Sequence, residues 1–276
     1  MLDSPVEPAN DGVRGAVITR VRPHISVMDW QGEGIVLGVR KHGETSAVVD
    51  LFSHAQGRHA GLVRGGISRK YRPVLQPGNT VLVEWRARMA EHLGFFTVEP
   101  VELRAGTLMD DALALSGLQA ACAIARESLP ERQAFPELYA AFGVLIDNLD
   151  DPEVWPALFV RWEAGLLEAL GYGLDLSRCA GGGNDELVYV SPRSGRAVSA
   201  SAGEEYADKL LKLPAFLRGE PMVTPNDVRA GLELTGYFLE SRLFWEMNRP
   251  LPELRARMVE RLEGAGVASP ASGGQR

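Results

Sequence analysis

The chain has 276 residues, of which 45% are hydrophobic and 24% charged, and its formal net charge is −7 at pH 7. This length and composition are typical of a globular protein with room for two domains. No apolar run approaches the roughly 18 residues of a membrane span, the first residues lack a secretory signal, and two cysteines are too few for a disulfide framework. We therefore expect a cytoplasmic protein with reduced thiols and no membrane partner.

The first 27 residues contain scattered Pro, Asp and Asn and show no sustained hydrophobic period, so we expect a disordered extension over 1–27. Met28 then opens MDWQGEGIVLG, which is typical of a domain start. This suggests the hypothesis that Met28 is the true translation start. Peptides from residues 1–27 in mass spectra of the native protein would exclude it.

The segment after Met28 predicts strands separated by turns. The expected strands are 34–40, 45–53, 58–64, 79–88 and 93–103. Residues 79–88 alternate between an apolar face and a more polar one, namely Val81, Val83, Trp85 and Ala87 against Leu82, Glu84, Arg86 and Arg88. Five short strands within about 75 residues predict a small barrel, and an OB barrel over 28–105 fits their number and length. An SH3-like barrel remains the alternative.

The hydrophobic period becomes helical after residue 105. We expect helices at 110–130, 135–151, 152–173, 225–247 and 251–263, with Asp151 as an N-cap and Gly171 or Gly173 ending the third. They define an α-helical domain over 106–263, interrupted by a Gly- and Ser-rich insertion over 174–204 with one strand-like run, ELVYVSP. The small, polar residues 264–276 predict a flexible tail. The predicted fold class is α+β, a five-stranded OB-type barrel followed by a helical domain.

Charge is distributed unevenly along the chain. Residues 28–104 contain ten Lys/Arg and eight Asp/Glu, whereas residues 105–276 contain sixteen and twenty-five. The basic surplus therefore belongs to the predicted barrel. Such asymmetry indicates a nucleic-acid surface joined to a module of different purpose.

Residues 62–88 concentrate this surplus, with six Lys/Arg and one acid, Glu84. Four of the cations fall on the predicted loop between the third and fourth strands, beside two glycines and Tyr71, and two fall on one strand face: Arg64, Arg69, Lys70, Arg72, Arg86 and Arg88. Long cations, backbone that allows close approach and a stacking aromatic are what a phosphate backbone requires. The alternative is a solvated face and a flexible loop.

Catalytic motifs are absent from the sequence. GEGIVLG has Leu37 where a dinucleotide fingerprint needs its third glycine, and there is no P-loop, HExxH or GxSxG. The histidines are scattered, and we interpret all of them as surface residues: His24, His42, His54, His59 and His92. We expect no enzymatic activity and no cofactor.

Metal binding is not expected either. Cys179 would open a CxxC pair, but its partner position is Gly182, and one thiolate cannot hold a four-coordinate zinc ion. Cys122 lies mid-helix among small apolar residues, which is typical of a buried cysteine. A stripe on the third helix predicts a core-facing side or, alternatively, a groove for a partner peptide: Phe159, Trp162, Leu166, Leu167 and Leu170.

The order and spacing of four stretches resemble the RecO family of bacterial recombination mediators, from Met28 to about Leu262. They are MDWQGEGIVLGVRKHGETSAVVDLFS, GLVRGGISRKYRPVLQPGNTVLVEWRAR, FVRWEAGLLEALGYGLDLSRC and YVSPRSGRAVS. The resemblance implies an N-terminal OB domain and a C-terminal helical domain. It also implies a protein, found with the nucleoid, that binds single- and double-stranded DNA and anneals complementary strands.

The resemblance further implies two protein partners. Such proteins work with RecR to load RecA onto DNA coated by single-strand-binding protein, and their helical domain binds the acidic C-terminal tail of that coating protein. A tail of this kind requires a cation beside an apolar pocket. The candidate cations are Arg126, Arg132, Arg161 and Arg242, and the sequence does not choose among them.

One family pattern is missing here. Many members carry two CxxC pairs that bind zinc in the insertion, and the matching positions in this chain are Cys179, Gly182, Ser199 and Ala202. The insertion is thus a degenerate zinc-finger region with a lone remnant, Cys179. We expect it to be held by packing and by turns at Pro192 and Gly195.

The resemblance and the charge map together predict the DNA contacts. To the six cations of residues 62–88 they add three outlying ones, Arg40, Lys41 and Arg58. Two alternatives remain open, an OB-fold RNA-binding protein and a non-catalytic scaffold whose barrel binds protein.

Overall fold

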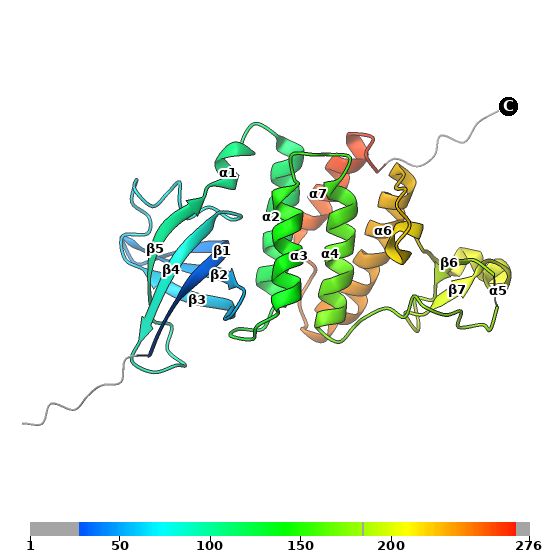
Figure 1. Cartoon of the computed structure of the whole chain (residues 1–276), viewed down its shortest axis with the longest axis horizontal. Coiled ribbons are helices and arrows are strands. Elements are labelled where there is room, and N and C mark those ends of the chain that lie inside the picture. The colour runs from blue at the N-terminus through cyan, green and yellow to red at the C-terminus, as the bar shows by residue number, and fades with distance from the viewer. Residues whose placement is uncertain (1–27, 184, 269–276) are drawn as a thin grey trace, which may run out of the picture.

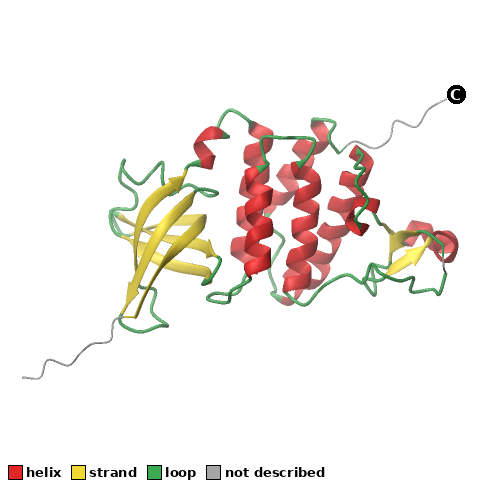
Figure 2. Cartoon of the chain, in the orientation of Figure 1, coloured by secondary structure: helices red, strands yellow, loops and turns green. Residues whose placement is uncertain are grey.

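The structure is a computed structural model that describes residues 28–183 and 185–268. A β-barrel lies at one end, a bundle of helices follows it, and a small sheet lies at the far end (Figure 1, Figure 2). The predicted extension over 1–27 lies outside the described residues. None of the helices in the described ranges is both long and apolar enough to cross a bilayer.

Five strands close the barrel in the order β1-β2-β3-β5-β4. Their bounds are β1 (Met28–His42), β2 (Ser46–Ser53), β3 (Gly57–Val63), β4 (Thr80–Ala87) and β5 (Phe95–Glu102). All neighbours are antiparallel except β3 and β5. The predicted five-stranded OB-type barrel is confirmed. β1 is longer than expected because its first half pairs with β4 and its second half with β2.

Side chains of β4 alternate between the barrel core and the outer face, as predicted. Val81, Val83 and Trp85 are at most 3% exposed, whereas Arg86 points to solvent. The connection between β3 and β4 contributes Val74 to this core, so it closes one end of the barrel. This connection is therefore ordered by burial at its base while its charged residues remain outside.

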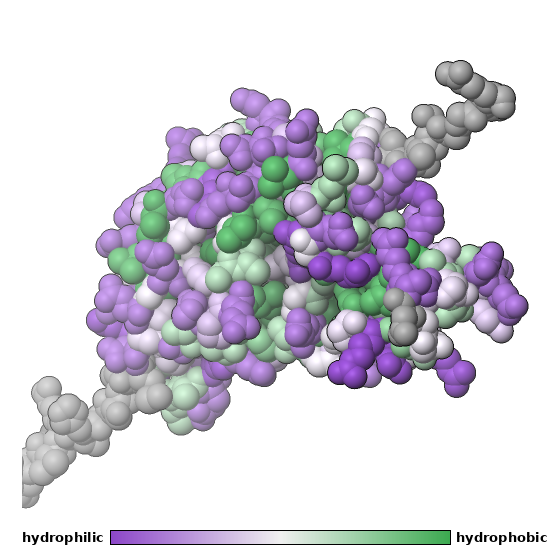
Figure 3. All heavy atoms as spheres, turned by 45° about the vertical axis from the view of Figure 1, so that its right-hand side comes forward, coloured by the Kyte–Doolittle hydropathy of each residue, from purple (hydrophilic) through white to green (hydrophobic). Residues whose placement is uncertain are grey.

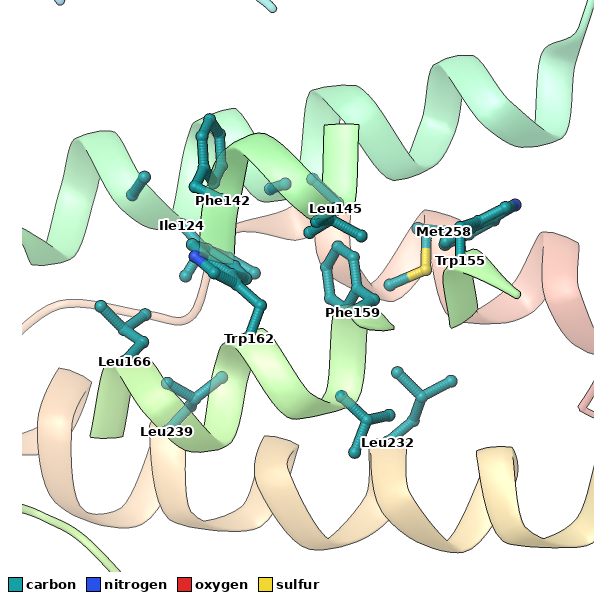
Figure 4. Packing of buried hydrophobic residues seen from close by; sticks show 14 of the residues in the cluster. Ile124, Phe142, Leu145, Trp155, Phe159, Trp162, Leu166, Leu232, Leu239 and Met258 are labelled. Atoms are coloured by element: carbon teal, nitrogen blue, oxygen red, sulfur yellow. The ribbon is translucent and has the colours of Figure 1, made fainter. Parts of the chain in front are cut away.

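The helical domain contains α1 (Arg104–Thr107), α2 (Ala112–Ser128), α3 (Pro136–Asp147), α4 (Trp155–Ala169), α6 (Pro225–Phe238) and α7 (Glu253–Gly264). The predicted stripe on α4 faces the core, where the Trp162 ring lies 5.3 Å from Phe142 and 5.9 Å from Phe159 (Figure 4). Gly171 ends this helix with φ of 89°. The N-cap prediction was wrong: Val154 caps α4, and Asp151 instead accepts from the Glu153 amide one turn earlier.

A buried ion pair joins three of these helices. Arg255 on α7 donates from Nε to Glu163 Oε1 on α4 at 2.6 Å and from Nη2 to the Leu232 carbonyl of α6 at 2.7 Å. Glu163 is fully buried and also accepts from the Thr235 hydroxyl. Because every charge has a partner, burial is tolerated and the helices are held in one register.

The predicted long helix over 225–247 changes character before it ends. After α6 the chain forms a π-helical turn, η3 (Leu239–Phe244), whose Leu239 and Phe244 remain in the core. The chain then turns into α7. The predicted tail over 264–276 starts too early, because Gly264 is the last residue of α7 and Ala268 is buried. Residues 269–276 lie outside the described part.

The insertion is more structured than its composition predicts. It contains β6 (Leu187–Val190), β7 (Ala197–Ser199) and α5 (Ala200–Gly203), and the ordered segment continues past the predicted end at 204 with η1 (Glu204–Lys209), β8 (Leu211–Lys212) and η2 (Ala215–Arg218). The three strands form a sheet in the order β7-β6-β8. The expected turn at Gly195 is present, with φ of 72°, and the Gly195 amide donates to the Ser191 carbonyl. Only β6 was predicted.

The barrel is fixed to the segment after α2. Arg58 of β3 donates from Nε to the Leu129 carbonyl at 2.7 Å and from Nη1 to Asp50 of β2 at 3.1 Å. Gly57 has φ of 64°, and a Cβ there would lie 1.8 Å from the Gln133 carbonyl oxygen. Only glycine allows such a close approach, so this junction is specified by sequence.

A second contact of the junction places α2 against β1. The Cys122 thiol is buried as predicted, and its Sγ lies 3.8 Å from the Val36 carbonyl oxygen. Burial raises the pKa of Cys122 to about 12, so the thiol stays protonated and unreactive.

Candidate nucleic-acid interface

The β3–β4 connection presents four cations to solvent: Arg64, Arg69, Lys70 and Arg72. None of them has a carboxylate within ion-pair distance among the described residues. Successive turns shape the connection, with the Arg72 amide donating to the Ser68 carbonyl at 3.0 Å. Gly65 adopts φ of 67°, so it provides a turn. These cations therefore keep their full charge for an external anion.

Part of the connection faces the helices. Arg69 and Arg72 border a hollow of about 530 Å³ whose other side includes Leu103 and Met109, before and after α1. The Lys70 ammonium lies 5.4 Å from the ring centre of Tyr71, which packs against the barrel core. The predicted aromatic neighbour is thus engaged in supporting the connection.

An exposed aromatic residue links the connection to β4. The Arg64 guanidinium lies 4.4 Å from the ring centre of Phe95, the first residue of β5. Phe95 is 45% exposed and pairs across the sheet with Arg86 on β4 and with Leu62 on β3. Two of the predicted cations, one from the connection and one from β4, are therefore brought next to Phe95.

The strand cations differ from those of the connection. Arg86 forms an ion pair with Glu84 on the same outer face of β4, and Asp29 of β1 lies opposite it in register. Much of its charge is therefore neutralised within the protein. Arg88 is exposed but lies one residue beyond the end of β4. Of the two arginines predicted to share one strand face, only Arg86 is therefore on the strand.

The three outlying cations differ in their exposure and in their ion pairs. Lys41 is exposed, and Arg40 is exposed with its Nη2 3.8 Å from the carboxylate of Asp50. Arg58 is only 17% exposed and is occupied by Asp50, Glu131 and the Leu129 carbonyl. Since the hydrogen-bond donors of Arg58 are used at the junction between the barrel and the helices, we no longer propose Arg58 as a DNA contact.

One histidine prediction was wrong. His59 is 3% exposed, and its ring lies 4.8 Å from Trp85, 5.2 Å from Trp30 and 5.9 Å from Phe96. Burial, with a smaller effect of the nearby Arg132, lowers the pKa of His59 to about 4. The alternation of β3 contained the signal, since His59 pairs with the inward-facing Leu51. His42, His54 and His92 are exposed, and His24 lies outside the described residues.

Comparison with known families decides the assignment. The family model for the N-terminal part of recombination protein O matches residues 28–104, and the model for its C-terminal part matches residues 109–250. The chain belongs to the RecO family.

Three proteins named DNA repair protein RecO illustrate the similarity. The protein of Phenylobacterium zucineum is 52% identical over 241 residues, which are 87% of this chain and 99% of that protein. The protein of Caulobacter vibrioides strain NA1000 is 51% identical over 240 residues, covering 86% and 99%. The protein of Methylorubrum extorquens strain PA1 is 54% identical over 240 residues, covering 84% and 97%. The match extends over both halves of the molecule, and the family is one of DNA repair proteins.

Three of the four positions that we expected to replace a family zinc site lie together, namely Cys179, Ser199 and Ala202. The Cys179 sulfur accepts from the Ser199 amide at 3.2 Å and from the Gly181 amide at 3.3 Å, and the Ala202 amide donates to the Ser199 hydroxyl. The hydrogen bond between Cys179 and the Ser199 side chain, followed by that from the Ser199 amide, lowers the pKa of Cys179 to about 7. Across the described ranges, no three His, Cys, Asp or Glu side chains are grouped to hold a metal ion.

The four candidate cations for a RecO partner tail are now distinguishable. Arg126 pairs with Glu127, Arg132 donates to the Ala90 and His92 carbonyls, and Arg242 lies over the Phe238 ring. Like Arg132 and Arg242, Arg161 has no carboxylate partner in the described part of the chain, and its guanidinium donates to the Phe216 carbonyl. It borders a hollow of about 510 Å³ with apolar and polar walls, lined by Ala164, Gly165, Glu168, Leu174, Leu176, Phe216, Leu217 and Gly219.

Proposed function

We propose that this protein binds single- and double-stranded DNA on its barrel, anneals complementary strands, and helps RecR to load RecA onto DNA coated by single-strand-binding protein. In this proposal residues 28–105 are the DNA-binding module, and residues 106–263 bind partners. The proposed mechanism involves binding alone, with no covalent step. A protein with this ligand would be found at the nucleoid.

The observation that carries the proposal is the set of unpaired cations on the β3–β4 connection. The helical part of the chain is strongly acidic, yet these four cations are exposed and unmatched. The contact surface we propose consists of Arg64, Arg69, Lys70 and Arg72, with Arg86, Arg88, Arg40 and Lys41 at its margins. Such a surface releases counterions from a phosphate backbone, so affinity falls steeply with salt.

Annealing follows from the same charges. Two complementary strands repel each other through their phosphates, and a cationic surface that contacts both lowers this repulsion. The proposed residues approach phosphate rather than base edges, so we expect little sequence preference. Base pairing then selects the product.

For the partner tail, we favour the hollow beside Arg161. An acidic tail that also carries an apolar side chain needs a cation next to an apolar wall. Arg161 provides the cation, and Leu174, Leu176 and Leu217 provide the wall. The Arg161 guanidinium lies 5.7 Å from the Phe216 ring and donates to the Phe216 carbonyl, which holds it at the edge of the hollow.

Annealing of complementary strands precoated with single-strand-binding protein tests the proposal. We expect acceleration that is reduced when the coating protein lacks its last few residues or when this protein carries Arg161→Glu. Annealing of bare strands should be unchanged by either alteration. If removal of the tail has no effect, the tail assignment is wrong, while a failure to anneal bare strands contradicts the DNA proposal itself.

Two further measurements address the remaining alternatives. Equal competition by matched RNA and DNA oligonucleotides would favour an RNA-binding protein, and absence of any DNA shift at low salt would favour a protein-binding scaffold. RecA assembly on coated strands, measured with and without RecR, tests the loading step. We expect assembly only when RecR and this protein are both present.

A further inference from the structure

We infer that Phe95 stacks against an unpaired nucleobase and so gives the barrel a preference for single-stranded over double-stranded DNA. The inference rests on the proposed DNA binding and adds to it an uncharged contact. Phe95 was not among the residues expected from the sequence, where the charged positions dominated the analysis.

The two neighbouring phenylalanines of β5 have opposite environments. Phe96 is 4% exposed and belongs to the barrel core, whereas Phe95 is 45% exposed on the outer face. Packing in the barrel core therefore explains the presence of an aromatic side chain at Phe96, but it does not explain the one at Phe95. An exposed aromatic ring on the same outer face as the exposed Thr97 and Glu99 suggests a contact with a ligand.

Two arginines neighbour this ring, the unpaired Arg64 and the ion-paired Arg86. The Arg64 guanidinium lies 4.4 Å from its centre, and Arg86 is its cross-strand neighbour. On the β3 side the neighbour is the half-buried Leu62, which is apolar. A nucleotide contains one flat apolar part and one anionic part, so a ring flanked by two arginines matches both parts of it.

Further exposed apolar residues lie on the loop that precedes β5. Met89 is 47% exposed and Leu93 is 39% exposed, and the loop is anchored through its Ala90 and His92 carbonyls by Arg132. The Gly94 carbonyl accepts from the Leu62 amide, which fixes the loop to β3 beside Phe95. In OB barrels the loop between the fourth and fifth strands borders the ligand face, so this position agrees with a nucleic-acid contact.

The preference for single strands follows from geometry. In a duplex each base is stacked on its neighbours and paired, so it cannot offer a face to Phe95 without unstacking. An unpaired base can do so freely. Duplex binding would then depend on the cations alone, whereas single-strand binding would gain a contact that does not depend on salt.

Substitution of Phe95 in the full-length protein tests the inference. We expect Phe95→Ala to weaken binding of a fluorescent oligothymidine about tenfold and binding of a duplex of equal length less than twofold. The slope of affinity against salt should be unchanged for both, because no phosphate contact is removed. Phe95→Trp should retain the preference, and Phe95→Leu should lose it while keeping an apolar side chain.

Val101→Ala is the matched control, because Val101 is a 52% exposed residue of the same strand away from the arginines. It should change neither affinity. Equal loss of single-strand and duplex binding in Phe95→Ala, or no loss in either, would overturn the inference. If the unaltered protein binds neither DNA, the proposed function fails instead. Thermal melting of each variant identifies any that does not fold, in which case Phe95→Leu replaces Phe95→Ala.

Discussion

The β3–β4 connection and the helical domain both contain several arginines, and ion pairing is much more frequent in the helical domain. In the helical domain Arg255 is buried against Glu163, while Arg126 and Arg249 share Glu127. On the connection the cations have no carboxylate among the described residues. If the connection binds DNA as proposed, pairing rather than the number of arginines would decide which of them contact phosphate.

The molecular surface is mixed in character. On the face shown in Figure 3, hydrophilic residues predominate and hydrophobic residues form separate patches. The proposed DNA surface is centred on the four cations of the connection that have no carboxylate partner among the described residues, and the ion-paired Arg86 and Arg40 lie at its margins. Four predictions can break or sharpen the comparison.

The largest expected effect is on the free energy of unfolding when the buried ion pair between Glu163 and Arg255 is broken. Glu163→Ala would leave the Arg255 guanidinium uncompensated between α4, α6 and α7, so the free energy of unfolding should fall by about 3–5 kcal/mol. Urea denaturation followed by circular dichroism measures this. The double substitution Glu163→Leu with Arg255→Met removes both charges and should recover most of the stability. A loss below about 1 kcal/mol for Glu163→Ala would show that the pair is not needed.

Next in size is removal of the unpaired cations. Replacing Arg69, Lys70 and Arg72 by Glu should lower affinity for single-stranded DNA about 100-fold near 0.1 M salt and reduce the salt slope by about 2, because each phosphate contact contributes roughly 0.7 to it. Fluorescence anisotropy over a salt series measures both quantities.

A matched control changes net charge equally but acts on paired arginines. Arg196, Arg229 and Arg257 form exposed ion pairs with Asp175, Glu233 and Glu253. Their triple replacement by Glu should reduce DNA affinity far less. If both triple variants bind equally weakly, overall charge rather than the connection controls binding.

A third prediction uses the pKa of His59. The folded protein lowers this pKa from 6.5 to about 4, so the unfolded chain takes up a proton that the folded chain excludes. Stability is therefore complete above pH 6.5 and is lost as pH falls towards 4, by about 2–3 kcal/mol from this group. Unfolding measured between pH 7 and 4 should show this loss, and His59→Phe should remove it. An identical pH dependence in the variant would contradict the assignment.

The smallest effect concerns Arg86. Glu84→Gln frees this arginine from its ion pair and should raise DNA affinity about two- to threefold, whereas Arg86→Gln should lower it by no more than that. The double substitution Arg86→Glu with Arg88→Glu should cost more, since it also removes the unpaired Arg88. A large loss on Arg86→Gln alone would show that DNA displaces Glu84 and that pairing in the free protein does not predict availability.

Much of the fold is predictable because it rests on local periodicity. The alternation in β4 and the apolar stripe on α4 specify which faces are buried, and both are confirmed. The insertion was underestimated because β7 and β8 are short strands whose pairing to β6 is a tertiary event. The N-cap of α4 was misplaced because Asp151 ends a turn that sequence alone does not distinguish from a cap.

The sequence predicts which residue types form the proposed DNA site, but it does not predict which of its arginines have partners inside the protein. The cations of residues 62–88 are visible in the sequence, but the occupation of Arg58 by Asp50 and Leu129 depends on how the barrel meets the helices. Phe95 was missed because a Phe-Phe pair in a strand does not reveal which ring faces outward until the register is known.

The close junction around Gly57 has a mechanical consequence. In Figure 1, α2 and α3 stand between the barrel and α4, and the barrel is joined to this bundle by backbone-level contacts rather than by a linker. A tail captured beside Arg161 would hold the cationic connection at a constant reach from the coated strand. The molecule would then act as a rigid spacer, which raises the local concentration of one strand near another without any change of shape.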